Sequence, residues 1–255
     1  MNKNIILVAI IVAVCASFVS CINVTPINRE NGNLITSEIA VSEFDRINIR
    51  NHANVRFHQS EEFRVVVTAD RSLYESIEIA TSGNTLSIGM RRGSRSNVRL
   101  NVGQGNFNVG ANRSHFAVDV YAPTLSGVTV SGSGSFENTE TLIVPAFAAT
   151  VAGAGRVTSL IESENFSATV SGSGRIIPVG SSQNAEIRIS GSGSFRGSEF
   201  VINNATARIS GSGSANVHAI ENLNANISGS GSIRYQGNPR VESRVSGSGR
   251  IRRVD

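Results

Sequence analysis

The chain is short of the residues from which many binding and catalytic sites are built. It contains no tryptophan and only 2 cysteines, and aromatic residues make up 5% of its 255 residues. Both cysteines, Cys15 and Cys21, lie near the N-terminus, so we expect neither a disulfide framework nor a cysteine-based metal site. Proline is equally scarce, with 5 residues against 25 glycines, which excludes collagen-like and proline-rich segments.

Charge of either sign is also thinly spread. Lys3 is the only lysine, and 23 basic residues against 19 acidic ones leave a formal net charge of +4. The arginines are scattered along the chain and do not form a basic tract. We therefore expect no nucleic-acid partner.

The first 20 residues have the pattern of a secretory signal. Lys3 and the amino terminus precede an unbroken apolar run at 5–14, which is too short to span a bilayer as a helix. Cys21 follows a small residue, Ser20, as in a bacterial lipoprotein signal that is cleaved before a lipid-carrying cysteine. We predict a signal peptide at 1–20, a lipid on Cys21 and a tether at 21–39. The alternative is ordinary secretion with cleavage nearby.

A short Ser-Gly motif recurs through the C-terminal half. Copies such as VSGSGR at 170–175 and ISGSGS at 189–194 could be mistaken for flexible linkers. Their first glycines, however, recur every 18 to 21 residues, at Gly132, Gly153, Gly172, Gly191, Gly211, Gly229 and Gly247. A period of this length is typical of a repeat architecture, and we predict regular repeats from 128 to 255.

The residues before each motif alternate with a period of two, as in a strand with one buried face. Ala185, Ile187 and Ile189 share one side, while Glu186 and Arg188 share the other. Continuing this alternation places both glycines of the motif inward, at positions with no room for a side chain or at a bend. Glycine and β-branched residues argue against a helical repeat. We predict an all-β fold, a single-stranded parallel β-helix or β-solenoid, right-handed by the usual crossover preference.

The segment from 44 to 120 alternates too, but without the 19-residue period. Runs such as 63–67 and 116–120 predict strands, and the polar stretch at 81–84 predicts a hairpin turn. This segment forms either irregular first coils of the same solenoid or a cap over its end. We predict one continuous unit at 40–255.

Motifs that carry catalytic chemistry are not completed. His52 and His58 lack a third ligand at a useful spacing, and no G-x-S-x-G motif is present. The aspartates do not repeat with the coils, which argues against periodic calcium sites. We therefore expect no catalytic residue, metal or cofactor. The alternative is a polysaccharide-active β-helix enzyme, which needs clustered carboxylates or basic residues in a groove.

One outward face remains as a candidate ligand surface. It repeats the motif serines beside a column that changes from Thr169 to Arg188 and Arg208, with Glu186 offsetting part of the like charge. We predict that the arginine-bearing end binds an anionic or polyhydroxyl glycan. The alternative is that serine is simply the smallest polar residue tolerated beside glycine. The candidate residues are Ser171, Ser173, Arg188, Ser190, Ser192, Arg208, Ser210 and Ser212.

The lipoprotein-like start, the early strands IRNHANVRFHQ and FRVVVTAD, and the serial VSGSG motifs together resemble a family of bacterial envelope proteins. It is the "putative autotransporter adhesin, head GIN domain" family, and the resemblance runs from about residue 40 to the end. It implies a β-helix-like fold and an envelope location, and it brings no catalytic residues. We therefore expect a non-enzymatic, adhesin-like binding or structural module, lipid-anchored in the outer membrane. Its expected partners are the membrane and a glycan or an envelope protein.

Overall fold

The computed structural model describes residues 24–25, 34–91 and 116–254. Strands dominate these ranges, and the helix α1 (Arg71–Tyr74) is a single turn. No helix in the described ranges is long and apolar enough to cross a membrane. The predicted signal peptide, Cys21 and residues 92–115 lie outside the described residues.

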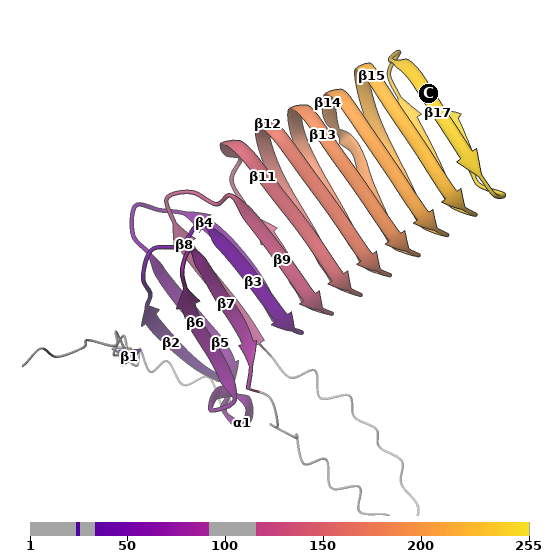
Figure 1. Cartoon of the computed structure of the whole chain (residues 1–255). Helices are drawn as coiled ribbons and strands as arrows, with labels where there is room; N and C mark the ends of the chain where they lie inside the picture. The colour runs from indigo at the N-terminus through magenta and orange to yellow at the C-terminus, as the bar shows by residue number, and fades with distance from the viewer. Residues whose placement is uncertain (1–23, 26–33, 92–115, 255) are drawn as a thin grey trace, which may run out of the picture.

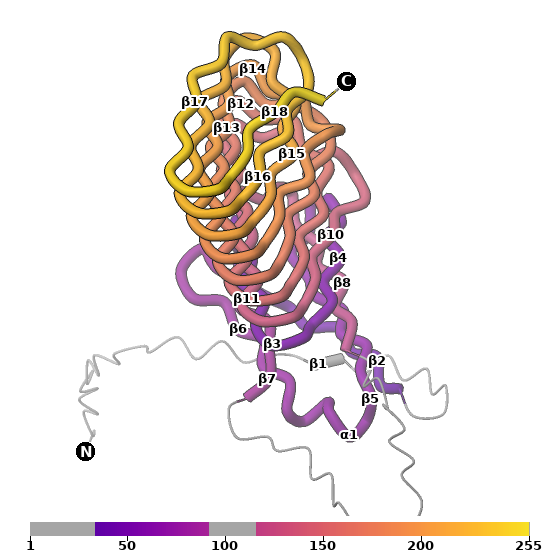
Figure 2. Tube along the Cα trace, turned by 90° about the vertical axis from the view of Figure 1, so that its right-hand side faces the viewer, coloured from indigo at the N-terminus to yellow at the C-terminus, as the bar shows by residue number. Residues whose placement is uncertain are grey.

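The strands wind into a stack of coils along one axis, with two faces joined by turns at both edges (Figures 1 and 2). In spatial order, face A consists of β6 (Ile77–Ser82), β7 (Thr85–Met90), β3 (Arg46–Asn51), β9 (Gly127–Gly132), β11 (Leu142–Gly153), the later halves of β12 (Arg156–Gly172), β13 (Arg175–Gly191), β14 (Ser194–Gly211) and β15 (Ser214–Gly229), and β17 (Arg240–Ser246). Face B consists of β1 (Val24–Thr25), β2 (Leu34–Ala40), β5 (Arg64–Asp70), β8 (Phe116–Ala122), β4 (Asn54–Gln59), β10 (Ser135–Asn138), the earlier halves of β12 to β15, β16 (Ser232–Gln236) and β18 (Arg250–Arg253).

Consecutive coils pair in parallel and in register. Gly153, Gly172 and Gly191 align with one another, as do the strand residues that precede them. Seen from the N-terminal end, the coils turn clockwise as they recede, so the solenoid is right-handed (Figures 1 and 2). The predicted fold class, including its handedness, is confirmed.

The Ser-Gly-Ser-Gly motif forms the turn from face A to face B. β12 ends at Gly172 and β13 begins at Arg175. Gly172 is exposed and has a φ of 117°, a conformation that side-chain-bearing residues rarely adopt. The prediction that the first glycine points inward is therefore wrong, because the chain bends at this residue.

The second glycine of the motif does point inward. Gly174 is buried, and a Cβ atom on it would lie 2.6 Å from the carbonyl oxygen of Gly155 on the preceding coil. The N–H groups of Ser173 and Gly174 both donate to the carbonyl of Gly153, at 2.9 Å. Hydrogen bonds between coils therefore continue through the turn, and two glycines with different roles make this close approach possible.

The N-terminal half contains both coils and a cap. β3 pairs in parallel with β7 and β9, and β4 pairs in parallel with β8 and β10, so the β3–β4 coil lies between two later ones. Asn51 aligns with Gly132 and has a φ of 64°, so it takes the place of the first motif glycine. The strands β2, β5 and β6 add antiparallel pairings that cap this end.

The predicted tether at 21–39 is wrong for its last residues. β2 pairs antiparallel with β5 along its whole length, from Leu34 opposite Asp70 to Ala40 opposite Arg64. Ser37 is buried, and Ile39 packs against the core. Residues 34–39 therefore belong to the folded unit, because β2 covers an edge of β5 that would otherwise be unpaired, and Val24–Thr25 pairs with β2 in turn.

The core is a continuous column of apolar side chains between the two faces. Phe166 anchors it, with ring centroids 6.2 Å from Phe147 and 4.8 Å from Phe200. Ala215 remains in register at the inward position that Phe195 occupies on the neighbouring coil. Burial on this scale, without a disulfide between the described strands, makes packing the main source of stability.

Candidate functional site

The outward side of face A carries two long parallel grooves and a smaller pocket lined by Asn222, Asn224, Arg240 and Glu242. Because outward side chains alternate along each strand, this side presents columns about 6.7 Å apart, whose members repeat about every 4.8 Å along the axis. One groove, which we call the serine groove, lies next to the Ser-Gly turn and has a volume of about 600 Å³. The other, the asparagine groove, lies next to the opposite turn and has a volume of about 610 Å³.

The serine groove contains five of the eight predicted ligand residues. Its wall beside the turn consists of Ser171, Ser190, Ser210, Ser228 and Ser246. Its other wall consists of Thr169, Arg188, Arg208, Asn226 and Arg244. The remaining predicted residues, Ser173, Ser192 and Ser212, are exposed at the apex of the turn and do not line the groove, because the chain bends at the glycine before each of them.

A ridge of three charged side chains separates the two grooves. One carboxylate oxygen of Glu186 lies 2.5 Å from a guanidinium nitrogen of Arg188 and 2.5 Å from one of Arg208. The arginine side chains are 55% and 50% exposed and Glu186 is 36% exposed. Ion pairs with this exposure contribute little stability, so a competing anion can replace Glu186 as a partner of the arginines.

The asparagine groove was not predicted from the sequence. Asn165, Asn184, Asn204 and Asn222 stand in register on four consecutive coils and line it. Each side-chain amide donates to the preceding one, at 3.3, 3.4 and 2.8 Å. The signal was present, since an asparagine stands 7 residues before the first motif glycine in each of these repeats.

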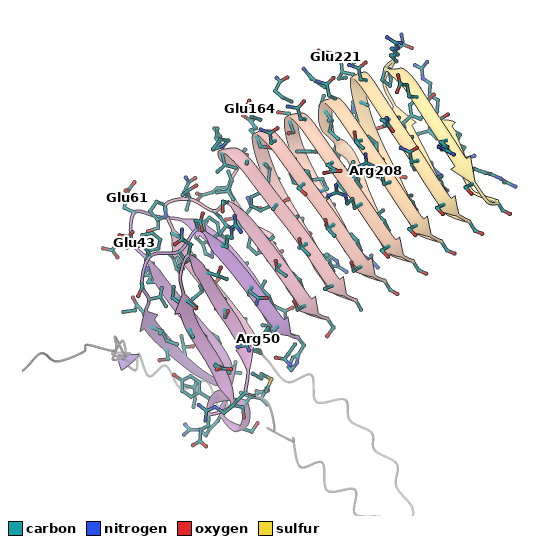
Figure 3. The ribbon with its side chains drawn as sticks, in the orientation of Figure 1. Glu43, Arg50, Glu61, Glu164, Arg208 and Glu221 are labelled. Atoms are coloured by element: carbon teal, nitrogen blue, oxygen red, sulfur yellow. The ribbon has the colours of Figure 1, made fainter. Side chains whose placement is uncertain are left out.

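Glutamates collect along the edge where face B passes into face A. Figure 3 shows Glu61, Glu164 and Glu221 along this edge, with Arg208 on the face. Among the residues that line the two grooves, Glu186 is the one carboxylate. Within the described residues no group of three or more His, Cys, Asp or Glu side chains could hold a metal ion.

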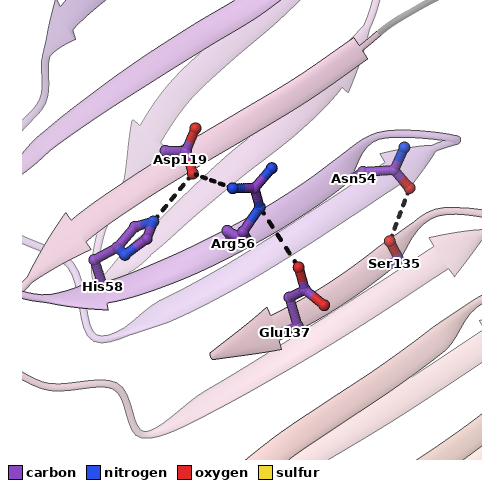
Figure 4. Close-up of polar contacts among 6 residues, drawn as sticks. All are labelled: Asn54, Arg56, His58, Asp119, Ser135 and Glu137. Carbon is purple, nitrogen blue, oxygen red and sulfur yellow. Dashed lines mark hydrogen bonds and ion pairs between the residues drawn. The ribbon is translucent and has the colours of Figure 1, made fainter. Parts of the chain in front are cut away.

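Face B carries a polar cluster near the N-terminal end (Figure 4). His58 Nε2 lies 3.0 Å from Asp119 Oδ1, and the His58 ring stacks on Tyr121. Arg56 approaches Asp119 at 3.8 Å on one side and Glu137 at 3.5 Å on the other. These contacts join β8, β4 and β10, so His58 is a half-buried residue that pairs across neighbouring coils.

The in-register coils and the glycine turns define this protein as a parallel β-solenoid. Its outer face carries grooves lined by repeating side chains. The family follows from sequence comparison, because the model of the family described as "Putative auto-transporter adhesin, head GIN domain" matches residues 43–239. The chain belongs to this family. Membership in an adhesin-like family is consistent with a cell-surface or envelope protein. No curated protein matches the chain.

Solved structures share the fold over most of the chain. A putative adhesin from Bacteroides fragilis has a TM-score of 0.75 and 23% identity, covering 88% of this chain and 98% of its own. A putative lipid binding protein from Parabacteroides distasonis has a TM-score of 0.66 and 26% identity, with the same coverage of 88% and 98%. A putative adhesin from Parabacteroides merdae has a TM-score of 0.64 and 22% identity, again covering 88% and 98%. At these identities the likeness to the two adhesins shows the fold alone.

Proposed function

We propose that this protein is a non-enzymatic binding module of the bacterial envelope, and that its serine groove binds an anionic or polyhydroxyl glycan. The observation that carries the proposal is the register of Arg188 and Arg208 on neighbouring coils, opposite a row of serine hydroxyls in one groove. Guanidinium groups form paired, charge-assisted hydrogen bonds with carboxylate, sulfate or phosphate groups. Serine hydroxyls can both donate to and accept from sugar hydroxyls.

The shape of the groove favours a linear polymer. Its lining runs from Thr169 and Ser171 to Arg244 and Ser246, across five coils. At about 4.8 Å per coil the walls extend for about 19 Å, with a serine on every coil and an arginine on three of the five. A repeating ligand can therefore meet a repeating surface. Hydroxyl and guanidinium groups favour such a polar ligand over the lipid that one relative's name suggests.

The alternative of a polysaccharide-active enzyme has less support. Glycoside hydrolysis generally uses two carboxyl groups that face each other across the scissile bond. Glu186 is the one carboxylate in the lining of the grooves, and two arginines already contact it. Glu164 and Glu221 lie on an edge (Figure 3) and line neither groove.

A glycan array tests this proposal. Wild type should bind at least one acidic or polyhydroxyl polysaccharide, and the double variant Arg188→Ser/Arg208→Ser should lose affinity by at least about tenfold. Arg196→Ser is the matched control, because Arg196 is an exposed arginine on face B of the same coil as Arg208. Equal signals from wild type and the double variant, or no signal from wild type, would remove the proposal.

We also propose that the module is held at the outer membrane by a lipid on Cys21. The support is the sequence alone, namely the apolar run that ends shortly before a Ser20-Cys21 junction. Incorporation of labelled palmitate into wild type, and none into Cys21→Ala, is the expected result. A wild-type protein that takes up no label would contradict the anchor and leave the groove proposal intact.

A further inference from the structure

The asparagine ladder ties four coils together, but its three hydrogen bonds are not equally strong. Its two longer hydrogen bonds, 3.3 Å from Asn184 to Asn165 and 3.4 Å from Asn204 to Asn184, exceed the usual range for N–H to oxygen bonds. Asn165, Asn184 and Asn222 are also exposed. Long, solvated bonds of this kind add little to stability, so these two contacts tie the coils only weakly, unlike the 2.8 Å bond from Asn222 to Asn204.

Each amide keeps unused hydrogen-bonding capacity. A side-chain amide has two N–H donors and an oxygen with two lone pairs. A ladder contact uses one donor of an asparagine and one lone pair of its neighbour. A free donor and a free acceptor therefore remain at Asn184 and Asn204, and this pair repeats about every 4.8 Å along the axis.

The surroundings of the ladder define the class of ligand. Apart from Glu186, which contacts the two ridge arginines, the groove is lined by uncharged residues such as Ser167, Thr206 and Asn224. Because both arginines already hold Glu186, a strongly charged polymer finds no free counter-charge here. The aromatic rings below, Phe147 and Phe166, are 1% and 3% exposed, so they offer almost no surface to a lipid tail.

We propose that the asparagine groove is a second binding site, separate from the serine groove, and that it takes a neutral, linear polysaccharide. Pairs of adjacent hydroxyl groups match the free donor and acceptor of each amide, since a hydroxyl both donates and accepts. The columns that bound the groove are about 6.7 Å apart, which suits a single extended chain. The ridge of Glu186, Arg188 and Arg208 keeps the two sites apart on one face.

Affinity electrophoresis through gels containing dextran, mannan or laminarin tests this site. Wild type should be retarded by at least one of these neutral polysaccharides. The variant Asn184→Ala/Asn204→Ala should bind it about tenfold more weakly, as expected for the loss of two or more hydrogen bonds. Asn203→Ala is the matched control, because Asn203 also bonds across coils, to Gln183 at 2.9 Å, but lies outside the groove.

The remaining outcomes separate this site from the serine groove. Arg188→Ser/Arg208→Ser should leave retardation by the neutral polymer unchanged. No retardation of wild type, or an equal loss in Asn203→Ala, would overturn the asparagine site, whatever acidic polymers bind. Should the double alanine variant fail to fold, Asn204→Asp keeps the size and removes both donors. Undiminished retardation of Asn204→Asp would also overturn the proposal.

Discussion

Glu186 and Arg208 are 22 residues apart in the chain but are joined across neighbouring coils by a hydrogen bond of 2.5 Å. The same carboxylate oxygen contacts Arg188 on its own strand. Two of the three arginines in the serine groove therefore already have an internal anionic partner. In the proposed site a ligand anion must compete with Glu186, so we expect this carboxylate to limit how strongly the groove binds it.

Replacing Glu186 should strengthen anion binding. In Glu186→Gln the ridge loses its carboxylate and both arginines become available to the ligand. Because exposed ion pairs contribute about 0.2 to 1 kcal/mol, we expect the affinity for polygalacturonate to rise by up to about fivefold. Isothermal titration measures this directly. Glu164→Gln is the control, since Glu164 lies on the edge outside both grooves (Figure 3). Weaker binding by Glu186→Gln would show that the carboxylate assists the ligand.

Salt should affect the two grooves differently. Contacts between exposed charges are screened at physiological ionic strength, with a Debye length of about 8 Å, and more strongly above it. Acidic polysaccharide binding should therefore weaken steadily as sodium chloride is added, and Arg188→Ser/Arg208→Ser should show a shallower dependence. Retardation by a neutral polysaccharide should hardly change. An acidic ligand whose affinity is insensitive to salt would argue against the arginines as its partners.

The inward glycine of the motif should be intolerant of a side chain. A Cβ atom at Gly174 meets the backbone oxygen of Gly155, which cannot move without disturbing the next coil. We expect Gly174→Ala to lower the free energy of unfolding by about 1 to 3 kcal/mol, the usual cost of overpacking. Urea denaturation provides the value. Ser173→Ala, at the exposed apex, should change it by less than about 0.5 kcal/mol. Equal stability of the two variants would mean that the turn is not closely packed.

Substitution of Asn51 should also lower the stability of the fold, but for a different reason. Its φ of 64° is left-handed, and its side-chain oxygen accepts a hydrogen bond from the Met90 amide at 3.1 Å. Alanine disfavours this conformation by about 1 to 2 kcal/mol, whereas glycine tolerates it. The free energy of unfolding of Asn51→Ala should therefore fall below that of Asn51→Gly. The reverse order in a denaturation series would contradict the turn equivalence of Asn51 and Gly132.

The regular coils could be predicted because the Ser-Gly motif recurs once in each coil, every 18 to 21 residues. Spacing and alternation together give the strand, the inward side and the parallel stacking, and even the weakly apolar Ala215 falls into place. Alternation could not distinguish Gly172 from Gly174, because a bend interrupts the period of two between them. That difference depends on backbone conformation, and glycine itself permits both roles.

The N-terminal half and the asparagine groove were harder to predict, because the residues that meet there are far apart in the sequence. Asn51 performs the glycine role without resembling the motif. The β3–β4 coil lies between strands that come later in the sequence, so no local period marks it. Asn184 and Asn204 stand at the same position relative to the motif glycine, but only the stacked coils bring their amides together. The link from Glu186 to Arg208 likewise requires the register between coils.

Acidic glycans are proposed to bind between the serine row and the arginines of face A. A crystal structure of the protein with a bound oligogalacturonate tests it most directly. We expect ligand carboxylates at ion-pair distance from Arg188 and Arg208, with Glu186 displaced from at least one of them. A ligand ordered at the Ser-Gly turns or on face B, with both arginines still on Glu186, would contradict it.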